Sequence, residues 1–292
     1  MANQLWKSLT VGVKRRWWSG AKLAFGAVGG AWTLIEVLTK AIKPLDGYID
    51  THGWDFLKLM FLLFAGVFVR HVFEPTRVTF KLPASDTKIT LKYGDLFAEP
   101  ANLLIGVNEY FDGELGAPVA KSTVHGQFIV RNYGGSAAAF RTAVDPALAA
   151  TGKVPEARAR VLEPKNAYPI GTTAKLPNGA HSAFLMAMAH TELGPNSKAS
   201  CDPATLWVAL RGGLQVVHDQ GNGEPLAMAL FGNGQAGIKL EPQHLLRLLI
   251  LALVDFATNT NARLPKQVTI VLHESCFELL DLREIARDWK KV

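Results

Sequence analysis

The chain has 292 residues and a formal net charge of +6, a length that fits one domain plus an appendage because domains typically run to roughly 100–200 residues. Residues 1–88 hold 12 of the 31 Lys and Arg residues but only 6 of the 25 Asp and Glu residues, so the remainder is neutral. This placement argues against a nucleic-acid-binding face. Cys201 and Cys276 stand far apart without neighbouring ligands, so neither a disulfide framework nor a zinc site is expected.

Two apolar stretches in residues 1–74 predict a transmembrane helical hairpin, with helices over about 17–39 and 54–73. A basic cluster precedes the first helix, which begins with two Trp residues, and residues 44–55 between the two apolar stretches contain three Asp but neither Lys nor Arg. Both ends of the hairpin are therefore expected on the cytoplasmic side. The uninterrupted apolar cores are short, so buried or interfacial helices remain the alternative.

Glycines and charges within the two stretches predict helix contacts. Gly26 and Gly30 have the GxxxG spacing that lets helices approach closely, either within the hairpin or between copies. The alternative is that they reflect only the general abundance of small residues in membrane helices. Glu36 and Lys58 are expected at matched depth, and intramembrane charges usually face protein or water. We expect them to pair within the hairpin or across an oligomer.

Short strands alternating with helices follow from about residue 75, which predicts an α/β sandwich with a mostly parallel sheet over residues 75–292. Residues 133–167, rich in Ala, Pro, Arg and Gly, are expected to form a loop or insertion with short helices. The predicted strands are 77–82, 89–93, 103–107, 127–131, 184–189, 226–231 and 267–272, and the predicted helices are 202–218, 241–257 and 276–290.

Three segments that follow predicted strands are candidates for a nucleotide site, since ligands bind at the carboxyl ends of strands in such folds. An Asp in the first can accept a hydrogen bond from an adenine amino group or cap a helix. Hydroxyl residues in the second suit ribose or phosphate, and glycines in the third let backbone approach a pyrophosphate. The candidates are Gly94, Asp95, Leu96 and Phe97; Asn108, Glu109, Tyr110 and Phe111, with Ser122, Thr123, Val124, His125 and Gly126; and Gly232, Asn233, Gly234, Gln235, Ala236 and Gly237.

The strings 94–97, 107–112 and 122–128 resemble the macro domain of the membrane-anchored effector of bacterial Thoeris anti-phage defence. The resemblance covers essentially the whole chain and implies a three-layer α/β/α sandwich with a mixed, mostly parallel sheet that binds ADP-ribose. It implies that Asp95 reads the adenine amino group, that Asn108 lies near the distal ribose, and that the glycine loop holds the phosphates. Phe277 would stack on adenine.

One departure from the family pattern concerns catalysis. Macro domains that hydrolyse ADP-ribosyl bonds usually have a Gly-Gly-Gly loop near the distal ribose, where this chain has residues 122–126. We therefore expect a domain that holds its ligand without turning it over, with no catalytic residue, metal or cofactor. His125 as a base keeps a membrane-anchored ADP-ribosyl hydrolase as the alternative.

The resemblance also implies a partner and a cellular output. A TIR-domain enzyme would make an ADP-ribose-based signalling molecule from NAD during phage infection, for example histidine-ADP-ribose. Binding would favour a state in which the hairpins assemble as a homo-oligomer in the lipid bilayer. The bacterial inner membrane would then be disrupted and the cell killed or arrested, with the N-terminus and the macro domain in the cytoplasm. A membrane scaffold with a vestigial nucleotide site is a third, weaker reading.

Overall fold

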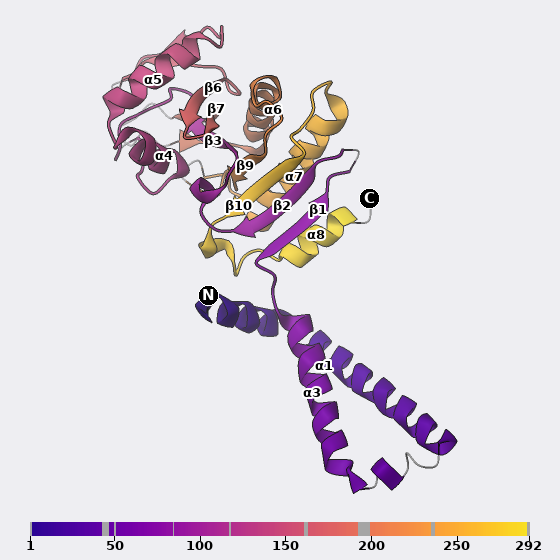
Figure 1. The fold of residues 1–292 in the computed structure, drawn as a ribbon. Coiled ribbons are helices and arrows are strands. Elements are labelled where there is room, and N and C mark those ends of the chain that lie inside the picture. The colour runs from indigo at the N-terminus through magenta and orange to yellow at the C-terminus, as the bar shows by residue number, and fades with distance from the viewer. Residues whose placement is uncertain are drawn as a thin grey trace. The chain divides into compact units, whose positions relative to one another are not determined.

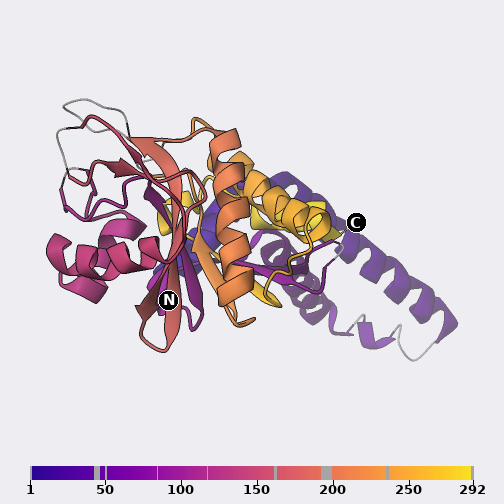
Figure 2. The ribbon, with the colours of Figure 1, turned by 90° about the horizontal axis from the view of Figure 1, so that it is seen from above.

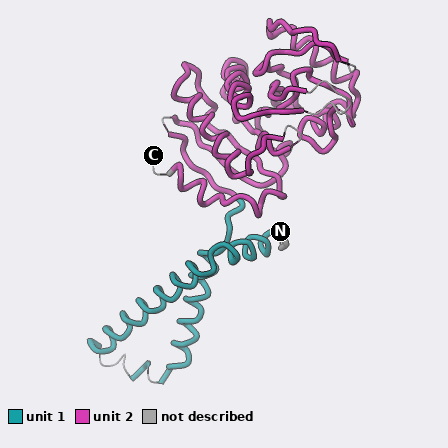
Figure 3. Tube along the Cα trace, turned by 180° about the vertical axis from the view of Figure 1, so that it is seen from behind, with its two compact units in different colours: residues 1–76 teal, residues 77–292 magenta. Residues whose placement is uncertain are grey.

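The computed structural model describes residues 2–42, 47–49, 51–83, 85–116, 118–160, 163–191, 199–234 and 237–290. The chain forms two compact units, Met1–Thr76 and Arg77–Val292, which Figure 3 draws in different colours. The first unit is helical, and the second contains all the described strands. Each unit is described by itself.

Two helices, α1 (Ala2–Ala41) and α3 (Gly53–Val72), pack against each other in the first unit (Figure 1). A kink at Arg16, where φ is −133° and ψ is 15°, divides α1. The helices approach closely at Gly12, where a Cβ atom would lie 1.5 Å from the Val72 carbonyl oxygen. At Gly26, Gly29 and Gly30 a Cβ atom would meet nothing within 4 Å, so the hairpin contact does not use the predicted GxxxG pair.

Among the described residues, one helix is long and apolar enough to cross a membrane, over Gln4–Ala41 with a mean hydropathy of 1.3. The charges Glu36 and Lys58 pair locally. Glu36 accepts from Lys40 at 3.0 Å within α1, and Asp55 accepts from Lys58 at 3.0 Å within α3. The structure thus gives each predicted charge a partner on its own helix, and the expected Glu36–Lys58 pair does not form within the hairpin.

A mixed sheet, with strand order β1-β2-β10-β9-β3-β7-β6, forms the centre of the second unit. The strands β2, β10, β9, β3 and β7 run parallel, while β1 and β6 are antiparallel at the two edges and β8 pairs antiparallel with β7. A separate short hairpin joins β4 to β5. The strands are β1 (Arg77–Lys81), β2 (Lys88–Tyr93), β3 (Asn102–Asn108), β4 (Glu156–Ala157), β5 (Asn166–Ala167), β6 (Thr173–Asn178), β7 (His181–Thr191), β8 (Ala199–Ser200), β9 (Leu226–Ala229) and β10 (Gln267–Leu272).

Helices cover both faces of this sheet, with α4 and α5 on one side and α6 and α7 on the other (Figures 1 and 2). Ile105 of β3 packs in a cluster with Phe128 of α4 and Phe140 of α5. Its neighbour Leu104 lies on the opposite face, 3.2 Å from the position a Cβ atom of Gly213 in α6 would occupy. Burial on both faces explains why β3 is a continuous apolar run. The helices are α4 (Val124–Tyr133), α5 (Ala137–Ala149), α6 (Pro203–Gln220), α7 (Pro242–Asn259) and α8 (Leu282–Lys290), with 3-10 turns η1 (Leu96–Ala98) and η2 (Glu274–Cys276).

The predicted fold class, an α/β/α sandwich with a mixed and mostly parallel sheet, is confirmed by this topology. The helix predicted from Asp202-Pro203 is present because the Asp202 side chain accepts from the Thr205 backbone N–H at 2.6 Å and Pro203 opens the first turn.

One predicted strand is wrong, because residues 127–131 belong to α4. Thr123 caps the start of this helix, with its side chain accepting from the Gly126 N–H, and Gly134 ends it at φ +60°. These caps provide hydrogen-bond partners for backbone groups at the two ends of the helix. In a strand, the same groups would pair with a neighbouring strand. The short helices expected within 133–167 include α5. One further prediction needs correction, because the last helix begins at Leu282, after η2.

Candidate functional site

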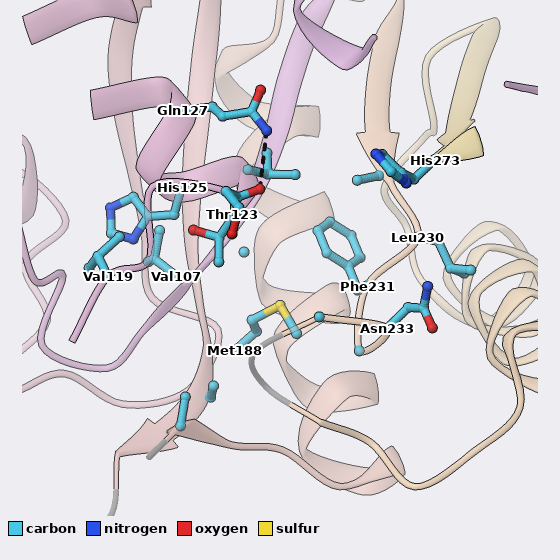
Figure 4. A pocket seen from close by; sticks show the side chains of 18 of the residues that line it. Val107, Val119, Thr123, His125, Gln127, Met188, Leu230, Phe231, Asn233 and His273 are labelled. Carbon is cyan, nitrogen blue, oxygen red and sulfur yellow. Dashed lines mark hydrogen bonds between the residues drawn. The ribbon is translucent and has the colours of Figure 1, made fainter. Parts of the chain in front are cut away.

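A cavity of about 440 Å³ opens where the parallel strands β3, β9 and β10 end, beside β7 (Figure 4). Its size lies in the range of small-molecule sites, which typically measure about 300–1,000 Å³. Three groups of predicted residues share it, from the end of β3, from the start of α4 and from the loop after β9. The lining residues are Gly106, Val107, Asn108, Pro118, Val119, Ser122, Thr123, Val124, His125, Gln127, Met188, Ala189, Ala199, Ala229, Leu230, Phe231, Gly232, Asn233, Gly234, Val271, His273, Ser275 and Cys276.

Asn108 ends β3 at the cavity wall and is 9% exposed. Its side-chain amide donates to the Asp112 carboxylate at 2.7 Å, and its side-chain oxygen accepts from the Asp112 backbone N–H at 3.2 Å. Both ends of the carboxamide are therefore held by one neighbour, which fixes its orientation.

The start of α4 forms a second wall. Ser122, Thr123 and Val124 line the cavity there, and the Thr123 hydroxyl accepts from the Gly126 N–H at 3.0 Å while donating to the Ala120 carbonyl at 2.7 Å. Gly126 itself lies behind this wall, since a Cβ atom there would come within 2.3 Å of the Ala120 oxygen. A helix N-terminus presents backbone N–H groups and a partial positive charge, which suits an anionic ligand.

His125 lines the same wall but is deeply buried, at 6% exposure. Its ring packs edge-on against Phe140, with 5.5 Å between ring centroids. Within the described part of the chain its Nε2 atom has no hydrogen-bond partner. Burial lowers the pKa of His125 from 6.5 to about 3, so the imidazole is neutral at physiological pH.

The glycine loop after β9 forms the third wall, with Gly232, Asn233 and Gly234 lining the cavity. Gly232 has φ +82°, and a Cβ atom there would lie 2.6 Å from the Ile238 side chain, so only glycine fits. At Gly234 a Cβ atom would meet nothing within 4 Å, which leaves the backbone open to a ligand. Gly237 closes the loop by donating to the Gly234 carbonyl at 3.0 Å. The predicted residues Gln235 and Ala236 lie outside the described residues.

The segment Gly94 to Phe97 is not among the lining residues. Asp95 caps η1 by accepting from the Phe97 N–H at 3.0 Å, and its carboxylate is 2.9 Å from the Arg131 guanidinium. Leu96 is buried, at 5% exposure. Asp95 thus adopts the helix-cap geometry that was the alternative to adenine recognition, and its adenine role stays a prediction.

The segment after β3 turns away from the cavity as well. Glu109, Tyr110 and Phe111 are 1%, 0% and 0% exposed, and none of the three lines the cavity. Glu109 accepts from Arg158 at 3.2 Å and from His190. These residues support the cavity from behind.

Phe277 also lies outside the lining set, although its neighbour Cys276 belongs to it. Phe277 is 4% exposed and packs on Tyr93, with 4.9 Å between ring centroids. The stacking of this ring on an adenine stays a prediction.

Several lining residues escaped the sequence reasoning, notably Met188 on β7 and His273 and Ser275 after β10. His273 shares a hydrogen bond of 2.8 Å with the Ser275 hydroxyl. His273 and Ser275 were predictable, because ligands bind at the carboxyl ends of parallel strands and the sequence of β10 clearly indicates a strand. Among the described residues no group of His, Cys, Asp or Glu could hold a metal ion.

Comparison with known proteins gives a family match and several structural similarities. A family model described as Thoeris protein ThsA, Macro domain, matches residues 89–273. A mutant macrodomain of Oceanobacillus iheyensis is similar at 12% identity and a TM-score of 0.48, covering 74% of this chain and 95% of that chain. The Oceanobacillus iheyensis macrodomain with ADP is similar at 10% identity and a TM-score of 0.46, covering 75% and 100%. A Trypanosoma brucei macrodomain in complex with ADP-ribose is similar at 16% identity and a TM-score of 0.41, covering 65% and 66%. No curated protein matches.

Proposed function

The chain belongs to the family of the Thoeris protein ThsA macro domain, and on that premise we propose that its cavity binds an ADP-ribose derivative as a signal. The observation that carries the proposal is the meeting of three polar segments in one cavity. The amide of Asn108, the N-terminus of α4 and the open backbone at Gly234 face a common space of about 440 Å³. Hydroxyls and phosphates are the groups that such donors recognise.

The mostly apolar character of the remaining wall supports a ligand that also carries a planar base. Met188, Phe231 and Val271 contribute apolar side chains to the cavity. Apolar walls with a few placed polar groups are typical of nucleotide-sized ligand sites. The group attached to ADP-ribose, such as histidine, would be recognised at this cavity as well. The TIR-domain enzyme that makes the ADP-ribose derivative would be the functional partner.

The first unit supports a membrane output. Its helices expose large apolar side chains, among them Trp17, Phe25, Trp54 and Phe61, as expected of helices that face lipid. We propose that α1 and α3 cross the bacterial inner membrane as a hairpin, with the N-terminus and the second unit in the cytoplasm. Ligand binding would favour an assembled state of the hairpins that disrupts the membrane and kills or arrests the cell.

Binding is tested by substitution in the glycine loop. Gly234→Glu adds a carboxylate where nothing now lies within 4 Å, and its charge would repel phosphates. We expect ADP-ribose to raise the melting temperature of the wild-type full chain in detergent and to leave that of Gly234→Glu unchanged. The matched control is Gly234→Ala, which adds one methyl group without charge and should keep most of the shift. Equal stabilisation of Gly234→Glu and the wild type would reject the site.

An anchored ADP-ribosyl hydrolase is the second candidate, with His125 as its base. The lowered pKa of about 3 makes this imidazole a weak base at neutral pH, whereas efficient general bases have a pKa near the working pH. That supports binding without turnover. Incubating the full chain with histidine-ADP-ribose and measuring free ADP-ribose separates the two, because sustained release that His125→Gln abolishes would establish the hydrolase.

A further inference from the structure

Two buried carboxylates follow the end of β3, and two arginines from the β4–β5 segment meet them. Glu109 and Asp112 are each 1% exposed. Arg158 pairs with Glu109 at 3.2 Å, and Arg160 pairs with Asp112 at 3.0 Å. A buried carboxylate without a partner is strongly unfavourable, and each of these two carboxylates has an arginine as its partner.

In the described part of the chain, side-chain hydrogen bonds join the second pair to Asn108 of the cavity wall. Asp112 accepts from the Asn108 side-chain amide at 2.7 Å and donates its backbone N–H to the Asn108 side-chain oxygen at 3.2 Å. A carboxylate only accepts and a backbone N–H only donates, so these contacts settle which end of the carboxamide is nitrogen. Each amide nitrogen carries two hydrogens; among the described residues the Asn108 nitrogen donates one to Asp112, and Asn108 lines the cavity, where the second can donate to a ligand.

Arg160 is itself immobilised. Its two terminal nitrogens donate to the two Asp112 oxygens at 3.0 and 3.1 Å, the bidentate geometry that arginine favours with carboxylates. One of them also donates to the Pro164 carbonyl at 3.1 Å. The guanidinium lies 4.0 Å from the centre of the Tyr110 ring, and the side chain is 4% exposed. The buried guanidinium of Arg160, which also contacts the Pro164 carbonyl and the Tyr110 ring, therefore fixes the position of the Asp112 carboxylate.

We propose that Arg160 is a positioning residue of the binding site, acting through Asp112 to fix the direction in which Asn108 presents its amide to the ligand. The inference rests on the proposed ADP-ribose function and adds to it a specificity determinant that never touches the ligand. Without Arg160, the buried Asp112 carboxylate would lose its charged partner and turn toward solvent. Asn108 would then lose its charged acceptor and its fixed orientation.

The test compares two arginines in the same β4–β5 segment. The affinity of the full chain in detergent for ADP-ribose is measured by isothermal titration calorimetry. Arg160→Met should weaken binding roughly tenfold, the equivalent of one hydrogen bond in the site. Arg158→Met, the matched control, removes the same charge from a pair whose side chains make no described hydrogen bond to the Asn108 carboxamide, and should leave the affinity unchanged. Arg160→Lys, which keeps the charge but not the bidentate fork, should recover part of the loss.

A double-mutant cycle separates positioning from a general structural role. If Arg160 acts through Asn108, then adding Arg160→Met to Asn108→Ala should cause almost no further loss, whereas a general role would multiply the two losses. Asp112→Asn, which removes the charge that Arg160 meets while keeping the side-chain size, provides a second variant where Arg160→Met fails to fold.

The outcomes also separate this inference from the function on which it rests. Wild-type protein that does not bind ADP-ribose would reject the proposed function and the inference together. Binding that Asn108→Ala weakens, but that Arg160→Met and Asp112→Asn leave intact, would reject only the role of Arg160.

Discussion

His125 shows how burial decides what a side chain can do. In sequence it is a histidine in a polar loop, open to catalysis or binding. In the structure it lies on the first turn of α4, 6% exposed, with its ring against Phe140. Desolvation disfavours the imidazolium, and this lowers its pKa to about 3. The residue is therefore a neutral part of the cavity wall.

The same shift predicts a pH dependence of stability. The pKa of His125 is about 3 in the folded chain against 6.5 as the ordinary value, so between these values the unfolded chain binds a proton that the folded chain does not. This contribution to stability is complete above pH 6.5 and is lost as the pH falls toward 3, by up to about 1.4 kcal/mol per pH unit. Urea unfolding between pH 7 and pH 5 should show a smaller loss for His125→Gln than for the wild type. Parallel losses would contradict the assigned burial.

Arg160 illustrates the residues that sequence reasoning misses. It lies in the stretch expected to be an insertion, 48 positions from Asp112, and no local motif joins the two. Asn108 and Gly234, in contrast, follow strands that the sequence shows clearly. Residues that touch a ligand can be predicted from their position at the end of a strand. Residues that hold those ligand-binding residues in place depend on contacts between segments that are distant in sequence.

At the scale of elements, the glycines of α1 have two kinds of surroundings. Gly12 and Gly20 lie where the helices touch, and Cβ atoms there would come within 1.5 Å and 2.9 Å of Val72 atoms. Gly26 and Gly30 have open surroundings. Close approach through small residues lets helix backbones pack tightly. Gly26 and Gly30 are therefore available for a contact between two copies of the chain under the proposed function.

This division gives a matched pair of substitutions. Gly12→Ala places a methyl group on the Val72 backbone, so the helices must separate, and overpacking of this kind typically costs about 1–3 kcal/mol. Gly26→Ala places the same methyl group in open space. In thermal unfolding of the full chain in detergent, Gly12→Ala should lower the midpoint of the hairpin transition and Gly26→Ala should not. Equal midpoints would show that the close approach at Gly12 is not needed.

The helix α4 shows where local pattern and tertiary context disagree. Its apolar run Phe128, Ile129 and Val130 follows the pattern of a strand, which is why 127–131 was predicted as one. The deciding features are the Thr123 cap and the αL glycine at 134. Capping chemistry at both ends, and not the apolar run between them, identifies the element.

At the scale of the whole molecule, one chain contains a helical hairpin and a second unit that we propose binds a ligand. A ligand shifts an equilibrium only by its differential affinity for the two states. Under the proposed function, the cavity supplies a place for that affinity, and the apolar helices of the first unit supply the output. Under the proposed function both units are needed, one to bind the ligand and the other to damage the membrane.

The joined function can be tested in lipid vesicles. With the full chain reconstituted, histidine-ADP-ribose should release a trapped dye, and Gly234→Glu should abolish the release because the ligand is repelled. Gly234→Ala should retain it. The double substitution Gly26→Leu and Gly30→Leu should keep ligand binding but reduce release, because bulk replaces the open glycines. Release by Gly234→Glu at the wild-type level would contradict the coupling of ligand binding to membrane damage.

The sequence by itself determined the strands of the parallel sheet, the apolar character of the N-terminal helices and the family, because apolar periodicity and short strings of residues are local signals. The tertiary structure alone decided the helix at 124–133, the close approach at Gly12, and the Arg160–Asp112–Asn108 chain. These depend on burial and on contacts between distant segments. Such contacts set which polar groups lose water and which must be paired, and a linear pattern does not contain that information.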